Sequence, residues 1–147
     1  MSSDGGLSLF WGDDHQTFRL GIGQFRELQE KVNLRRLAIG APIVGPMALL
    51  NGLRANDAWP DDIRDVLRLG LVGGGKTPAE AHRLLTHYFD DFIAHPPLEN
   101  MRPAFVVLMA GLAGAPGDDA KKKRPRKPRA TSTPRSTSPA STDPGRP

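Results

Sequence analysis

The chain has 147 residues, enough for one ordinary domain, with a formal net charge of +4 and a pI of about 9.9. It contains no cysteine, which excludes disulfides, thiolate catalysis and cysteine-ligated zinc and is compatible with a reducing cytosol. No signal peptide is visible in residues 1–14, and the longest apolar run, residues 104–115, is too short to span a bilayer. We therefore expect a soluble cytoplasmic protein with no membrane partner.

The positive charge is concentrated at the C-terminus. Residues 116–147 hold nine Lys or Arg and three Asp, a net charge of +6, so the rest of the chain carries a net charge of −2. The same segment has seven of the 14 prolines, eight Ser or Thr, and no apolar side chain larger than alanine. It cannot bury enough apolar surface to offset its ordering entropy. The sequence predicts a folded domain over residues 1–115 and a basic, disordered tail over residues 116–147.

The N-terminal part of the domain predicts a hairpin followed by a helix. Apolar and polar residues alternate on either side of Gly12-Asp13-Asp14, which is typical of a β-hairpin pairing residues 7–11 with residues 16–20. From Gln24 the apolar residues Phe25, Leu28 and Val32 follow helical spacing. Residues 34–39 either continue this helix or form a short turn.

Two further helices are predicted before the middle of the chain ends. One begins at Pro46, with Met47, Leu50 and Leu53 on its apolar face. The next opens at residues 59–62, where two acids favour the positive end of the helix dipole, and ends at the glycine triplet 73–75.

The last two predicted helices follow the glycine triplet. Residues 77–80 form a capping box, and an apolar stripe extends to Phe92 before Pro96-Pro97 stops the helix. The final helix covers about residues 100–112 and is apolar nearly all round, so we expect it to be the most buried element. The predicted fold class is mainly α: a small bundle of four to five short helices with an N-terminal β-hairpin and a disordered C-terminal tail.

Residues 70–77 satisfy the phosphate-binding P-loop pattern G-x-x-x-x-G-K-[ST]. A P-loop needs a buried strand before it, yet residues 61–69 carry helical spacing. Thr77 is expected to cap a helix, and the alternating strands and helices of a nucleotide-binding sheet are absent from the pattern. A glycine linker between two helices is the favoured interpretation, and P-loop nucleotide binding is a remote alternative.

No catalytic or metal-binding constellation emerges. His82 and His87 are five residues apart and do not share a helical face, and His15 and His95 have no ligand pattern around them. Asp61-Asp62 and Asp90-Asp91 are adjacent acids, which point apart on a helix. We expect no enzyme activity, no cofactor and no metal site.

Two surfaces remain as candidate interaction sites. The first is a cationic run that could contact a polyanion and that could equally be a solubilising segment: Lys121, Lys122, Lys123, Arg124, Arg126, Lys127 and Arg129. No aromatic residue interleaves it, so base stacking is not indicated. The second is the apolar segment 96–115, which is either core or partly a groove for a partner helix.

Several phrases taken together resemble a known family. They are residues 17–29, 62–71 with 73–75, 78–81, 97–100 and 110–112. In order and spacing these phrases resemble the tail assembly chaperones of gene transfer agents and related long-tailed phages and prophages, over roughly residues 10–114. The chain is longer than the family pattern between Val32 and Gly45, and its basic tail extends past the usual end.

The resemblance implies a small, helical, non-enzymatic protein of the bacterial producing cell. It would bind the tape measure protein, keep that client soluble and help to recruit tail tube subunits. The family offers no catalytic motif and no partner-binding positions to carry over. A small nucleic-acid-associated protein acting through the basic tail is the alternative function, and the oligomeric state is left open.

Overall fold

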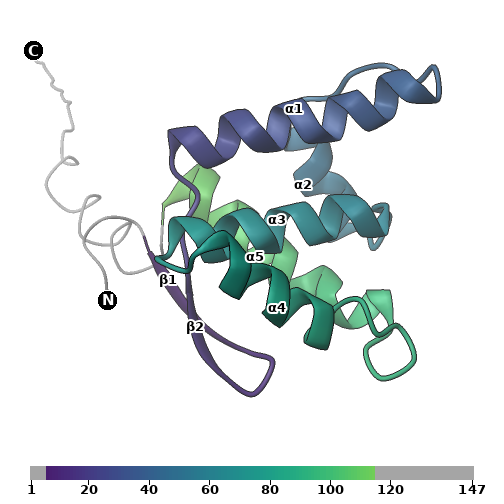
Figure 1. The fold of residues 1–147 in the computed structure, drawn as a ribbon. Coiled ribbons are helices and arrows are strands. Elements are labelled where there is room, and N and C mark those ends of the chain that lie inside the picture. The colour runs from purple at the N-terminus through teal and green to yellow at the C-terminus, as the bar shows by residue number, and fades with distance from the viewer. Residues whose placement is uncertain (1–5, 115–147) are drawn as a thin grey trace, which may run out of the picture. The chain divides into compact units, whose positions relative to one another are not determined.

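The structure, a computed structural model, describes residues 6–114 and confirms the predicted mainly helical fold class (Figure 1). A two-stranded hairpin precedes five α-helices, the last of which follows a short 3-10 helix. The elements are β1 (Leu7–Trp11), β2 (Asp14–Phe18), α1 (Ile22–Ala38), α2 (Pro46–Arg54), α3 (Pro60–Gly73), α4 (Pro78–Tyr88), η1 (Pro97–Asn100) and α5 (Met101–Ala113).

The predicted hairpin is present, but its second strand begins two residues earlier than expected. The strands are antiparallel, and Trp11 faces Asp14 across a turn of only two residues. Gly12 has a φ of 74° at the first turn position, where tight hairpin turns place glycine. A Cβ at Gly12 would also lie 2.8 Å from the ring of Tyr88, so both conformation and packing require glycine there.

Helix α3 is the most buried element, which corrects the prediction that the last helix would be. In Figure 1 it runs between α1 and α4, with α5 behind it, and it also contacts β2. Eight of its 14 residues are buried, whereas α5 buries five of 13. The apolar surface of α5 extends farther round the helix than its neighbours can cover, so Phe105, Met109 and Leu112 are only partly shielded.

Glycines at the end of α3 and just after it let the last residues of β2 and the backbone that follows them pass close to the helix. The amide of Arg19 donates to the carbonyl of Gly70 over 2.9 Å. A Cβ at Gly73 would lie 1.9 Å from the carbonyl oxygen of Arg19, and one at Gly74 would lie 2.0 Å from that of Thr17. No side chain fits in these gaps, so this packing explains why glycines gather here.

Three other boundary predictions were incomplete or wrong. Residues 34–38 continue α1 rather than forming a turn, and Met47 is exposed while Leu49 takes its place in the core. Helix α4 ends at Tyr88, well before Pro96, and Phe92 lies outside it. The helix closes where the amides of Phe89 and Asp90 both donate to the carbonyl of Leu85, and Asp91 then holds the chain in a turn, because its Oδ1 accepts hydrogen bonds from the amides of Ile93 and Ala94.

Candidate functional site

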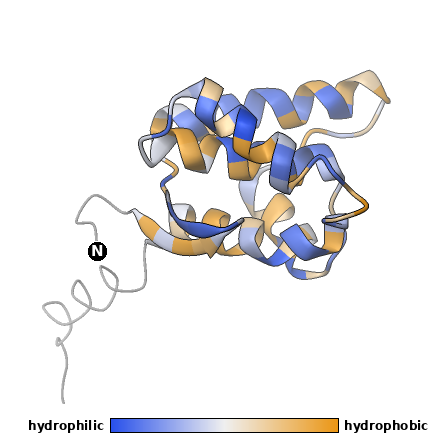
Figure 2. Cartoon of the chain, turned by 60° about the horizontal axis from the view of Figure 1, so that its bottom comes forward, coloured by the Kyte–Doolittle hydropathy of each residue, from blue (hydrophilic) through white to orange (hydrophobic). Residues whose placement is uncertain are grey.

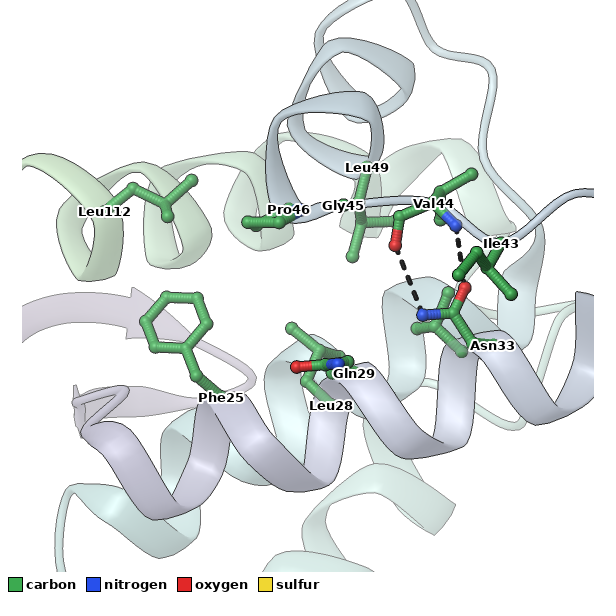
Figure 3. Close-up of a pocket in the computed structure, with 11 residues that line it drawn as sticks. Phe25, Leu28, Gln29, Asn33, Ile43, Val44, Gly45, Pro46, Leu49 and Leu112 are labelled. Carbon is green, nitrogen blue, oxygen red and sulfur yellow. Dashed lines mark hydrogen bonds between the residues drawn. The ribbon is translucent and has the colours of Figure 1, made fainter.

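An apolar groove of about 540 Å³ lies between the first two helices and the end of the last one (Figure 3). A cavity of this size is in the range that proteins use for binding. In Figure 3 the ring of Phe25 faces Leu112 across the groove. The lining residues are Phe25, Leu28, Gln29, Val32, Asn33, Ile43, Val44, Gly45, Pro46, Leu49 and Leu112.

One amide side chain fixes the loop that forms one wall of the groove. Asn33 accepts a hydrogen bond from the amide of Val44 at 2.8 Å and donates one to its carbonyl at 3.2 Å. These two bonds imitate the pairing of a neighbouring strand. They tie the α1–α2 loop to α1 at one point, so the shape of the groove is set before any partner arrives (Figure 3).

A cluster of buried charges holds α1, the opposite wall, against α3. Asp62 is fully buried, and its two carboxylate oxygens accept hydrogen bonds from Arg35 at 2.7 Å and from Arg36 at 2.9 Å. A second Arg35 nitrogen lies 2.8 Å from Asp65, an ion-pair contact whose geometry is not that of a hydrogen bond. Burial disfavours the charge of Arg35, but its interactions with the two aspartates outweigh burial and raise the pKa of Arg35 above its usual value.

Four exposed apolar side chains lie on the segments that form or adjoin the groove walls, and we call them the apolar rim. They are Leu37, Ile39, Ile43 and Met47, all more than half exposed. They lie at the end of α1, in the loop after it and in the first turn of α2. Figure 2 shows hydrophobic colour reaching this end of α1 and its loop, outside the packed interior. Neighbouring exposed apolar side chains of this kind mark interaction sites.

The P-loop pattern does not form a phosphate cradle in the structure. Residues 70–73 belong to α3, and the next four amides donate to protein acceptors: Gly74 to Gly70, Gly75 to Val72, Lys76 to Leu71 and Thr77 to Glu80. Thr77 in turn accepts from the amide of Glu80, which confirms the predicted capping box. Those amides are therefore unavailable to a nucleotide phosphate, and the segment is a linker between two helices, as favoured by the sequence.

The adjacent acids singled out in the sequence include two, Asp62 and Asp90, that form ion pairs within the fold. Asp61 is exposed beside the buried Asp62, whose pairing with Arg35 and Arg36 was missed from the sequence. Asp90 makes a bidentate pair with Arg64, at 2.9 and 3.0 Å. Among residues 6–114, no group of three His, Cys, Asp or Glu side chains is placed to hold a metal ion.

A second, smaller cavity of about 220 Å³ lies where the hairpin meets α4 and η1. Its polar side chains are used internally: Asn100 accepts a hydrogen bond from the Trp11 indole at 2.7 Å, and His95 lies 2.6 Å from Glu99. A hydrogen bond to Asp13 raises the pKa of Tyr88. These bonds join the hairpin to the helices and give this cavity a structural role.

The structure describes only one of the two candidate interaction surfaces that the sequence suggested. The cationic run from Lys121 to Arg129 lies outside the described residues. In the described part of the apolar segment 96–115, Met101, Ala104, Val107 and Leu108 belong to the core, and Leu112 alone lines the groove. The groove draws most of its lining from α1, the loop after it and α2, a combination that periodicity within single segments did not reveal.

A family model described as "Phage tail tube protein, GTA-gp10" matches residues 4–114. The chain belongs to this family. The match covers the segment that carries the sequence resemblance, and it confirms a phage and gene transfer agent tail family with a role in tail assembly. The family description names the tail tube and not a chaperone. No curated protein and no solved structure matches the chain. None of the helices in residues 6–114 has the length and apolar character needed to cross a membrane.

Proposed function

We propose that this member of the tail family is a tail assembly chaperone, a binding protein without catalytic activity. Its client would be an apolar helical segment of the tape measure protein, and it would help to recruit tail tube subunits. The observation that carries the proposal is the apolar groove with its adjoining rim. A groove between helices, rimmed by exposed apolar side chains, is the surface into which an amphipathic helix docks.

The construction of the groove suits a client that must later be released. Its loop wall is held by the Asn33–Val44 pairing, so little ordering entropy is lost on binding. Its apolar lining can contact any sufficiently apolar helix and forms few hydrogen bonds that would make binding specific. Such a surface gives moderate affinity, which is consistent with displacement of the chaperone as the tail tube polymerises.

The test is co-expression with the tape measure protein of the same phage or gene transfer agent. The wild-type chain should keep the client soluble and co-purify with it, whereas Ile43→Asp, which puts a carboxylate on the groove wall, should lose both effects. Ile22→Asp is the matched control, because Ile22 is similarly exposed (70% against 65%) but does not line the groove. Equal client recovery with all three chains would contradict the proposal.

A structural subunit of the tail is the second candidate, and the description of the family as a tail tube protein favours it. A subunit remains in the finished particle, whereas a chaperone is absent from it. Purified tails examined by mass spectrometry distinguish the two roles: stoichiometric recovery of this chain supports the subunit, and its absence alongside abundant tube protein supports the chaperone.

A further inference from the structure

The connection between α4 and α5 presents a second apolar projection, far from the groove. Its turn, residues 91–95, carries Ile93 at its tip with 96% of the side chain exposed, and Phe92 and Leu98 beside it in sequence are also exposed. An isoleucine this exposed gains nothing from its own fold. A partner that covers it would gain the free energy of removing it from water.

This turn is held in one conformation. Asp91 accepts hydrogen bonds from the amides of Ile93 and Ala94, and its carbonyl accepts one from the amide of His95 at 2.8 Å. At its base, the bidentate pair between Asp90 and Arg64 ties the turn to α3. Ile93 is therefore a preordered anchor, and its burial in a partner would cost little conformational entropy.

The turn cannot reach the groove of its own chain. It precedes the N-terminal end of α5, whereas Leu112 lines the groove near the C-terminal end. The 11 helical steps from Met101 to Leu112 separate these ends by about 17 Å, at 1.5 Å a residue. A projection at one end of the helix and a groove at the other can meet only between two molecules.

The charges around the two features are complementary. Residues 25–56, which include the α1, loop and α2 walls of the groove, contain five Lys or Arg and two acids. Residues 89–100 around the turn contain three acids and no Lys or Arg. Arg35, Arg36 and Asp90 form ion pairs within the chain, and Glu99 lies 2.6 Å from His95, so Lys31 and Arg54 on the groove side and Asp91 on the turn side are left to contribute most to the attraction. This match favours association of turn with groove and disfavours groove with groove.

We infer that in the free protein the apolar groove is covered by the Ile93 turn of a second copy of this chain. The contact is head-to-tail, because each molecule offers a turn at one end and a groove at the other, so that association builds chains or closed rings. A single turn offers only a small contact area, and small interfaces are weak and readily exchanged. Resting on the proposed function, the inference adds a regulation of that site: self-association shields the groove until a client displaces the turn.

The test measures the oligomeric state of the full-length chain by sedimentation velocity over a concentration series. The wild-type chain should associate as its concentration rises. Ile93→Asp and Ile43→Asp should each weaken association by on the order of tenfold or more, because each buries a carboxylate against apolar surface. Ile22→Asp should associate like the wild type.

Mixing the two impaired chains gives the decisive result. The Ile43→Asp chain retains an intact turn and the Ile93→Asp chain retains an intact groove, so an equimolar mixture should form a one-to-one dimer that grows no further. A wild-type chain that stays monomeric, variants that associate normally, or a mixture that stays monomeric would overturn the inference.

The two proposals fail separately. If Ile43→Asp loses tape measure binding while the wild-type chain is monomeric, the groove binds the client and the self-association proposal is wrong. If the chains self-associate in the pattern above but bind no client, the turn-in-groove contact is supported and the chaperone proposal is wrong. Addition of client should dissociate wild-type oligomers if both hold.

Discussion

At the scale of single residues, two helical glycines have opposite roles. Gly73 in α3 faces the backbone after β2, where a Cβ would lie 1.9 Å from the carbonyl oxygen of Arg19. Gly23 in the first turn of α1 has no atom within 4 Å of the position a Cβ would take. The same substitution to alanine therefore meets a fixed backbone at one site and open space at the other.

We predict that Gly73→Ala destabilises the fold by about 2 kcal/mol or more, because the backbone carbonyl cannot move aside without shifting the hairpin. Gly23→Ala should stabilise it by about 0.5–1 kcal/mol through higher helix propensity and a less flexible unfolded chain. Urea denaturation followed by circular dichroism measures both. A Gly73→Ala chain as stable as the wild type would mean that the hairpin does not pack on α3 as described.

The glycines also show what sequence reasoning could reach. The phosphate-loop pattern was correctly set aside because the preceding residues have helical spacing and Thr77 heads a capping box. The actual reason for Gly73 and Gly74, the close passage of the hairpin backbone, lies in a tertiary contact with residues more than 50 positions away. Local patterns contain no trace of such a contact.

At the scale of elements, the docking of α1 on α3 depends on charges that the sequence pattern did not distinguish. Asp61 and Asp62 are adjacent acids in the first turn of α3, and both suit the helix dipole. Only the structure shows that Asp61 is exposed while Asp62 lies fully buried beneath Arg35 and Arg36. Because α1 forms one wall of the groove, this pair of helices also sets the shape of the site.

We predict that Asp62→Asn destabilises the fold by about 3 kcal/mol, because it removes the carboxylate that pairs with Arg36 and one of the two that pair with Arg35. Breaking a buried ion pair typically costs roughly 3–5 kcal/mol. We expect a loss at the low end of this range because the Arg35 and Arg36 side chains remain 32% and 18% exposed. Asp61→Asn, the matched control one residue away, should cost no more than about 1 kcal/mol. Urea midpoints compare the two, and equal losses would contradict the assigned role of Asp62.

Helix positions were predictable where capping and periodicity agreed, and failed where the chain turned although the apolar spacing continued. Pro46, Pro60 and Thr77 each mark a helix start that the structure confirms. The end of α4 was placed too late because the apolar stripe continues to Phe92. Past Tyr88 the chain turns instead, and the Asp91 side chain holds that turn by accepting hydrogen bonds from the amides that follow it.

At the scale of the whole molecule, the candidate site forms only when separate stretches of the chain fold together. Its walls come from residues 25–33, residues 43–49 and Leu112, and each stretch by itself reads as an ordinary helix face or loop. The sequence could suggest that some apolar surface serves a partner, and it pointed to residues 96–115. It could not show that α3 takes the centre of the bundle and leaves α1 and α2 with an unfilled groove between them.

Charge is also divided at this scale, since the folded domain is mildly acidic and residues 116–147 carry a net charge of +6. We predict that polyanion binding, where it occurs, belongs to the cationic run alone. Replacing its seven Lys and Arg residues by Gln in the full-length chain should abolish binding to nonspecific duplex DNA and leave tape measure binding unchanged. The groove, made of apolar surface in residues 25–112, does not depend on those cations.

The salt dependence of DNA binding supplies a quantitative check. If all seven cations neutralise phosphates, the logarithm of the binding constant should fall with the logarithm of salt concentration with a slope of about −6, and with a shallower slope if fewer take part. Fluorescence anisotropy of a labelled duplex over a salt series measures it. Client capture through an apolar groove should weaken little over the same series. A client interaction with the same steep slope, lost in the Gln-substituted chain, would instead place partner binding in the basic segment and remove the groove from the proposed function.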